Sequence, residues 1–139
     1  MALMWADNLS VGNATIDFEH RNLIAMVNNI GQILKEDGAS ALLQELEQIE
    51  YWLCTHFKNE ERIALAVGID VTQSKLEHQN LLKDFHHMKD ELRAMNGMWS
   101  DKLEKQYFQF LCDWIMDHVL EEDMLMKPVL QTHEYFFQG

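Results

Sequence analysis

Apolar residues recur at helical spacing in four long segments of the chain. The segments cover residues 17–37, 40–67, 72–95 and 101 to just before Pro128. Apolar positions three and four residues apart lie on one face of a helix, and the short links between the segments favour antiparallel neighbours. We therefore predict an all-α fold: an antiparallel up-down-up-down four-helix bundle, preceded by an irregular N-terminal arm over residues 1–14.

The chain is short and contains few helix breakers. Its 139 residues, with one proline and six glycines, fit a single domain built from long helices. We expect this bundle domain to cover residues 1–130. Residues 131–139 end in EYFFQG, which resembles a protease-recognition sequence added for expression. We therefore predict a partly non-native tail there and leave it out of the fold.

Charge narrows the range of functions. The formal net charge is −12, whereas nucleic acids and anionic membrane surfaces attract clustered Lys and Arg. The sequence has no apolar run of the ~18 residues that a membrane span needs and no recognisable signal peptide, so we expect a cytoplasmic protein. Cys54 and Cys112 are too few for a disulfide framework and are expected to fill the core.

Each predicted helix carries a histidine, and the four are His20, His56, His78 and His118. A single helical histidine is more often solvated or hydrogen-bonded than bound to a metal. Four of them on facing helices, however, are the arrangement from which bundles build metal sites. The other three have no carboxylate at a useful spacing and are expected on the surface: His86, His87 and His133.

His56 and Glu60 are four residues apart, which places them only ~40° apart on one helix face. The same face carries Leu53, Phe57 and Ile63, so it points inward. A buried carboxylate beside a buried imidazole is costly unless a positive charge accompanies it. A metal ion would supply that charge.

His118 and Asp123 form a second pair whose spacing is less favourable. Five residues correspond to ~140° on an ideal helix, so regular geometry would separate the two side chains. They could meet only through a local bend, or at the helix end near Pro128.

Several blocks of the sequence together resemble the hemerythrins, especially the bacterial ones, over residues 5–130. The matching blocks are Trp5, Val11-Gly12, Ile16 to His20, His56 to Glu61 with the later Gly68, and Trp114 to His118 with the later Asp123. The resemblance implies a non-haem pair of irons with an oxo or hydroxo bridge. It assigns His20 and His56 to one iron, His78 and His118 to the other, and Glu60 and Asp123 as bridges.

The resemblance also places Trp114 and Ile115 near the site, where an apolar pocket would limit water and proton access to bound dioxygen. Ordinary core packing explains both residues equally well.

One histidine of the family pattern is missing. The third helix of the family has His-x-x-x-His, but Ser74 precedes His78 here. A second alignment, with His78 as the first histidine, puts Leu82 at the missing position, although Lys75 and Leu81 fit the first alignment better. A hydroxyl is a poor iron ligand beside imidazole, so we expect an exogenous water or anion at the position vacated near Ser74.

The resemblance implies a domain that senses dioxygen or a redox state. Domains of this kind often regulate a fused or partner signalling effector, such as a cyclic-di-GMP synthase or a chemotaxis receptor. A free-standing dioxygen store or carrier is the alternative, and a metal-free bundle acting through its surface is a third. No acid–base or nucleophile pattern stands out beyond the proposed ligands, so we do not expect an enzyme.

Overall fold

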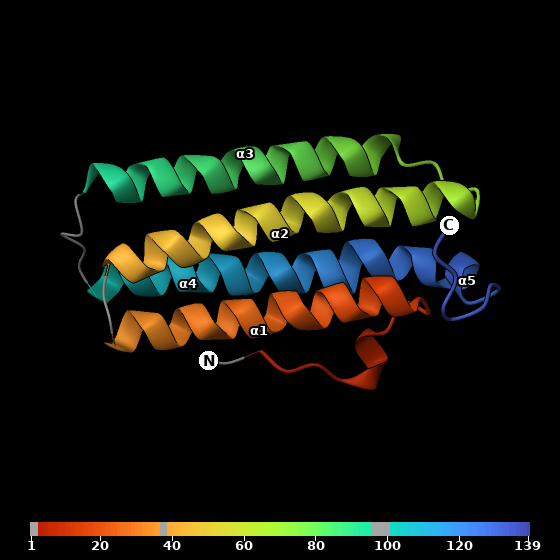
Figure 1. The fold of residues 1–139 in the computed structure, drawn as a ribbon, viewed down its shortest axis with the longest axis horizontal. Helices are drawn as coiled ribbons and strands as arrows, with labels where there is room; N and C mark the ends of the chain where they lie inside the picture. The colour runs from red at the N-terminus through yellow and green to blue at the C-terminus, as the bar shows by residue number, and fades with distance from the viewer. Residues whose placement is uncertain (1–2, 37–38, 96–100) are drawn as a thin grey trace.

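The computed structural model describes residues 3–36, 39–95 and 101–139. Four long helices run antiparallel to one another in sequence order, and α1 also packs against α4 (Figure 1). They are α1 (Ala14–Glu36), α2 (Ala39–Ala66), α3 (Thr72–Ala94) and α4 (Asp101–Met116). The N-terminal arm is irregular apart from a 3-10 turn, η1 (Asp7–Leu9). The predicted four-helix bundle is confirmed.

The helix boundaries follow local capping. α1 begins three residues before the predicted start because the Asn13 side chain accepts a hydrogen bond from the Ile16 N–H at 3.1 Å, which satisfies a free backbone donor of the first turn. The predicted end of this helix at Asp37 lies outside the described residues. After α2, Gly68 adopts a positive φ of 85°, a conformation that favours glycine.

The fourth helix differs from the regular helix that the sequence predicts. After Met116 the chain widens into a π-helical segment, η2 (Asp117–Glu122), and tightens into a 3-10 turn, η3 (Asp123–Met126). A short helix, α5 (Lys127–Leu130), then follows. Pro128 lies in the first turn of α5, where its missing N–H would have no helical partner in any case.

Buried apolar side chains form two clusters along the bundle. The large core takes residues from all four long helices, including Leu23, Leu46, Phe85 and Leu111. The small core lies where α2 ends and η3 and α5 begin, and it comprises Val11, Ile16, Ile63, Ala64, Val71, Met126 and Leu130. Along α1, Ile16 belongs to the small core and Leu23 to the large core, so His20 lies in a layer between the two.

The two cysteines are free thiols. Cys112 is buried in the large core and Cys54 is half-buried. Burial raises the pKa of the Cys112 thiol, which makes it unreactive near neutral pH. For Cys112 this agrees with the predicted packing role, whereas Cys54 belongs to neither core cluster.

Both ends of the chain pack against the bundle. Trp5 is half-buried against the large core, with the Arg21 guanidinium 4.8 Å from its ring. In the tail, the Tyr135 carbonyl accepts the Ala14 N–H at 2.7 Å and the Tyr135 hydroxyl donates to Asp17 at 2.8 Å. The tail therefore covers the start of α1, while the expectation that part of it is non-native stays a prediction.

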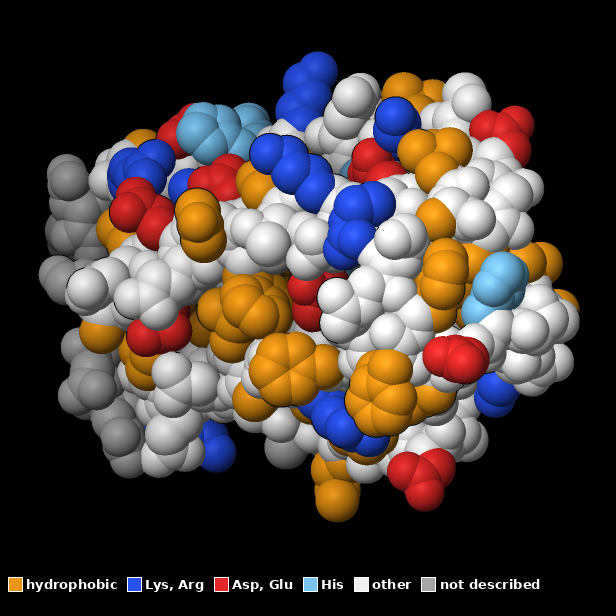
Figure 2. Space-filling view, turned by 45° about the vertical axis from the view of Figure 1, so that its right-hand side comes forward, with side chains coloured by type: hydrophobic (Ala, Val, Ile, Leu, Met, Phe, Trp, Pro, Cys, Tyr) orange, Lys and Arg blue, Asp and Glu red, His pale blue; other side chains and the backbone are white. Residues whose placement is uncertain are grey.

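The surface carries mixed charge on the face seen in Figure 2, where acidic, basic and hydrophobic side chains are interspersed. Within the described residues, no helix combines the length and the apolar character that crossing a lipid bilayer requires.

Candidate metal centre

Six buried polar side chains meet in the layer between the two apolar clusters. Five of them place one nitrogen or oxygen atom each within 4.8 Å of all the others, and these are His20, His56, Glu60, His118 and Asp123. The sixth, His78 of α3, has its Nε2 atom 3.6 Å from Glu60. The structure thus brings together all six residues that the sequence nominated as metal ligands; their role as ligands stays a prediction.

The π-helical segment brings Asp123 to the cluster. The Asp123 N–H donates to the carbonyl of His118, five residues earlier, a hydrogen bond that defines a wider turn than the α-helix. This turn puts Asp123 Oδ2 at 3.0 Å from His118 Nε2 and 2.6 Å from His20 Nε2. The local bend that the i+5 spacing requires is therefore present.

Several of the converging atoms lack hydrogen-bond partners. His56 Nε2 lies 3.0 Å from Glu60 Oε2 and 3.1 Å from His118 Nε2. Buried atoms with no hydrogen-bond partner in the described structure include His20 Nε2, Glu60 Oε2 and Asp123 Oδ2. Leaving buried polar atoms without a partner costs folding free energy. Imidazole nitrogens and carboxylate oxygens that point toward one place are ligands that suit non-haem iron. The residues present therefore fit a metal centre.

The electrostatics of the cluster favour one buried carboxylate charge over two. Burial, followed by the charge of Glu60, raises the pKa of Asp123 well above its usual value. Burial opposes charge on Glu60 as well, but His118, His56 and His78 together outweigh it and lower the pKa of Glu60. Burial also lowers the pKa of His20 well below its ordinary value. Without a cation, the cluster therefore disfavours a second carboxylate charge beside Glu60.

The outward ring nitrogens of three histidines face carboxylates that the sequence analysis did not nominate. His56 Nδ1 lies 2.9 Å from Glu19, and His78 Nδ1 lies 2.8 Å from Glu61. His118 Nδ1 lies 3.5 Å from Glu122, outside hydrogen-bond geometry. Only the His118/Glu122 spacing of four residues could have been seen in the sequence, because the other two contacts join different helices.

The neighbours of the cluster are largely aromatic and apolar. Trp114 stacks parallel to the His118 ring, with ring centroids 5.8 Å apart, and Ile115 is fully buried in the large core. Ser74 is half-buried on α3, one turn before His78. Leu82, the residue at the missing position in the second alignment, packs against the large core.

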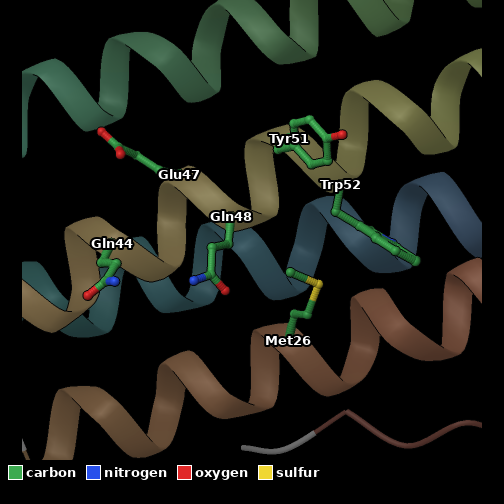
Figure 3. Close-up of a pocket in the computed structure, with 6 residues that line it drawn as sticks. All are labelled: Met26, Gln44, Glu47, Gln48, Tyr51 and Trp52. Carbon is green, nitrogen blue, oxygen red and sulfur yellow. The ribbon is translucent and has the colours of Figure 1, made fainter.

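The remaining histidines and the surface grooves lie apart from this cluster. His86, His87 and His133 are exposed, as predicted. The expectation that they have no carboxylate at a useful spacing is wrong for two of them, because His86 lies 3.5 Å from Asp90 and His87 lies 3.2 Å from Glu91, each four residues on. A groove of about 440 Å³ runs between α1 and α2 (Figure 3), and its lining residues are Met26, Gln44, Glu47, Gln48, Tyr51 and Trp52. None of the six converging residues lines it.

Comparison with known proteins identifies the family. The sequence model of the Hemerythrin HHE cation binding domain matches residues 11–130. Bacteriohemerythrin of Clostridium acetobutylicum is 26% identical over 129 residues, which cover 86% of this chain and 95% of that protein. A hemerythrin-like protein of Naegleria gruberi is 28% identical over 127 residues, covering 91% of this chain and 92% of that protein.

Solved structures agree at the level of the fold. The crystal structure of a wild-type hemerythrin superposes with a TM-score of 0.79 at 20% identity, covering 94% of this chain and 99% of that chain. Together with the family match over most of the sequence, this result leads to one conclusion: the chain belongs to the hemerythrin family, whose members bind dioxygen at a pair of non-haem irons.

Proposed function

We propose that this chain holds two irons and uses them to sense dioxygen or a redox state. The observation that supports this proposal most directly is a convergence of six side chains. One atom each of His20, His56, Glu60, His118 and Asp123 lies within 4.8 Å of the others, and His78 lies beside Glu60. In this proposal His20 and His56 bind one iron, and His78 and His118 bind the other. Glu60 and Asp123 lie in contact with histidines of both pairs, which suits bridging carboxylates.

Ser74 gives the proposed centre its distinctive property. The iron bound by His78 and His118 would have two imidazole ligands rather than three, with water or a small anion at the vacated position. Both irons would then offer an exchangeable position. The bound pair supplies the redox chemistry, and the surrounding apolar side chains, Ile115 and Trp114 among them, limit the access of water and protons.

Easier access to the irons suits a sensor better than a store. A carrier must stay reduced while it binds and releases dioxygen, and a second open position favours oxidation. The signalling outcome would be a shift in helix packing that a fused or partner effector detects. A free-standing dioxygen store remains the alternative, and slow autoxidation with fully reversible oxygenation would favour it.

Metal analysis tests the proposal first. We expect about two irons per chain, with the charge-transfer absorption of a bridged ferric pair after oxidation. A chain that binds no iron from an anaerobic Fe(II) solution would refute the proposal, as would an iron-loaded chain without those bands.

Azide titration of the oxidised protein tests the vacated position. We expect two azide-binding events in the natural sequence and one in Ser74→His, which restores the missing imidazole. The variant should also autoxidise more slowly. A single tight azide site in both proteins would show that Ser74 does not leave an iron open.

A further inference from the structure

Two adjacent carboxylates of α2 approach the two nitrogens of one imidazole ring. Glu60 Oε1 lies 3.6 Å from His78 Nε2, and Glu61 Oε2 lies 2.8 Å from His78 Nδ1. A carboxylate can only accept a hydrogen bond, and only Glu61 lies within hydrogen-bond distance of the ring. The proton of a neutral His78 therefore belongs on Nδ1. The Nε2 lone pair is then left pointing toward Glu60 and the cluster.

The His78 ring is also held from its face. Phe57 stacks on it with ring centroids 3.9 Å apart and an angle of 8° between the planes. The ring is buried, while the Glu61 side chain retains 18% exposure. Glu61 could therefore reach water, yet it turns inward to His78. A ring fixed by a stacking partner and an acceptor has little freedom to rotate away from a metal.

Each of the two proposed iron sites has one histidine whose outer nitrogen is hydrogen-bonded to a carboxylate. His78 and His118 each have a carboxylate of their own at Nδ1, at 2.8 Å and 3.5 Å. In the other pair, Glu19 supports His56 at 2.9 Å. His20 Nδ1 is buried with no hydrogen-bond partner among the described residues. His118 Nδ1 likewise has no hydrogen-bond partner among the described residues. At the pair that lacks a third imidazole, the hydrogen-bonded support therefore rests on Glu61 and His78.

We propose that Glu61 is a positioning residue for the iron that has only two histidine ligands. It would fix the orientation of the His78 ring and increase the electron donation of that ring to the iron. The inference rests on the proposed two-iron function. An acceptor at the outer nitrogen of a metal-bound histidine fixes its tautomer and makes it a stronger ligand. Glu61 would in this way offset part of the donation lost at Ser74. Glu122, at a longer distance from His118, would act in the same way but more weakly.

Anaerobic Fe(II) titration against a competing chelator tests this role in the full chain. We expect Glu61→Gln to weaken one of the two iron-binding events by about 10- to 100-fold and to leave the other unchanged. Glu122→Gln should have a smaller effect. Glu121→Gln removes an exposed charge next to Glu122 and should match the natural sequence. Far-UV circular dichroism of each variant controls for folding.

A double-variant cycle separates positioning from a structural link between α2 and α3. If Glu61 compensates for the missing imidazole, its replacement should cost less in a Ser74→His background than in the natural sequence. If Glu61 only joins two helices, Glu61→Gln should lower the melting temperature of the metal-free protein equally in both backgrounds, with both iron affinities unchanged, and the inference is overturned. A natural chain that binds fewer than two irons would overturn the proposed function and this inference with it.

Discussion

The large core and the histidine layer are both buried, but the first consists of apolar side chains and the second of polar ones. The large core is made of apolar side chains such as Leu23, Leu46 and Leu92, each at most 1% exposed. The histidine layer, which comprises the six converging residues, is equally inaccessible but consists of imidazoles and carboxylates. Burial alone therefore says nothing about whether a layer stabilises the fold.

The two layers gain their stability in different ways. Apolar burial is favourable without any partner, at about 25 cal/mol per Å² removed from water. Buried carboxylates and imidazoles lose hydration, and that loss must be offset by pairing or by a cation. The large core should therefore fold the bundle on its own, whereas the histidine layer should stabilise it only when metal is bound.

Of the changes that distinguish the two layers, metal removal should have the largest effect on the stability of the protein. An ion that binds only the folded chain contributes about 4 kcal/mol when it is present about 1,000-fold above its Kd, so two such ions contribute about 8 kcal/mol. We expect chelation to lower the melting temperature by more than about 15 °C. Differential scanning calorimetry of the loaded and chelated protein measures the shift.

Hydrogen exchange can locate where that stability is lost. Amides of η2 and η3, which carry His118 and Asp123, should lose more protection after chelation than those around Leu46, which exchange only through global unfolding. Uniform loss of protection along the whole bundle would contradict the idea that the two layers are independent.

Truncating the large core is the second effect in size. Leu46→Ala removes a side chain that is 1% exposed, and such changes cost about 2–5 kcal/mol through lost burial and the remaining cavity. We expect this loss in chemical denaturation of both loaded and metal-free protein, with iron content unchanged. Loss of iron from this variant would show that packing in the large core also shapes the site.

The same contrast explains how far the sequence could be interpreted. Periodicity predicted the large core well, because each apolar position contributes independently to a helix face. It also placed His56 and Glu60 together, since their spacing fits a regular helix. It failed for Asp123, because nothing in DHVLEE announces a π-helical turn, and only the family resemblance supplied that contact.

Contacts between helices could not be predicted from the sequence pattern, for a different reason. Glu19 and Glu61 each approach a histidine on another helix, and periodicity does not fix the rotation of one helix against the next. The docking of Tyr135 on Asp17 likewise joins distant parts of the chain. Such pairings depend on tertiary packing that no local pattern records.

Asp123→Asn should raise the free energy of unfolding of the metal-free protein, whereas truncating a large-core side chain should lower it. An unfolded Asp titrates near about pH 3.9, and burial, then the charge of Glu60, raises the pKa of Asp123 well above that in the folded protein. The folded chain therefore keeps a proton that the unfolded chain has released. The resulting stability is complete below about pH 4 and is lost as the pH rises through the folded pKa.

The asparagine variant carries no such proton, so it should lose less stability as the pH rises. We expect metal-free Asp123→Asn to exceed the metal-free natural sequence by about 1–3 kcal/mol near neutral pH, with a smaller gap near pH 5. Urea denaturation at several pH values measures the gap. The loaded variant should bind iron more weakly, and a variant less stable than the natural chain in both states would contradict the proposed cost of the buried charge.

The smallest expected effect concerns the start of α1, which supports the histidine layer from outside. Asn13 accepts the Ile16 N–H at 3.1 Å and donates to the Phe137 carbonyl at 2.7 Å, and His20 follows two turns later. Replacing a helix cap with alanine costs about 1 kcal/mol. We expect Asn13→Ala to lower the melting temperature of loaded protein by a few degrees without loss of iron, because His20 is fixed by its own buried contacts. If iron analysis showed one ion lost, the first turn of α1 would have to be counted as part of the site.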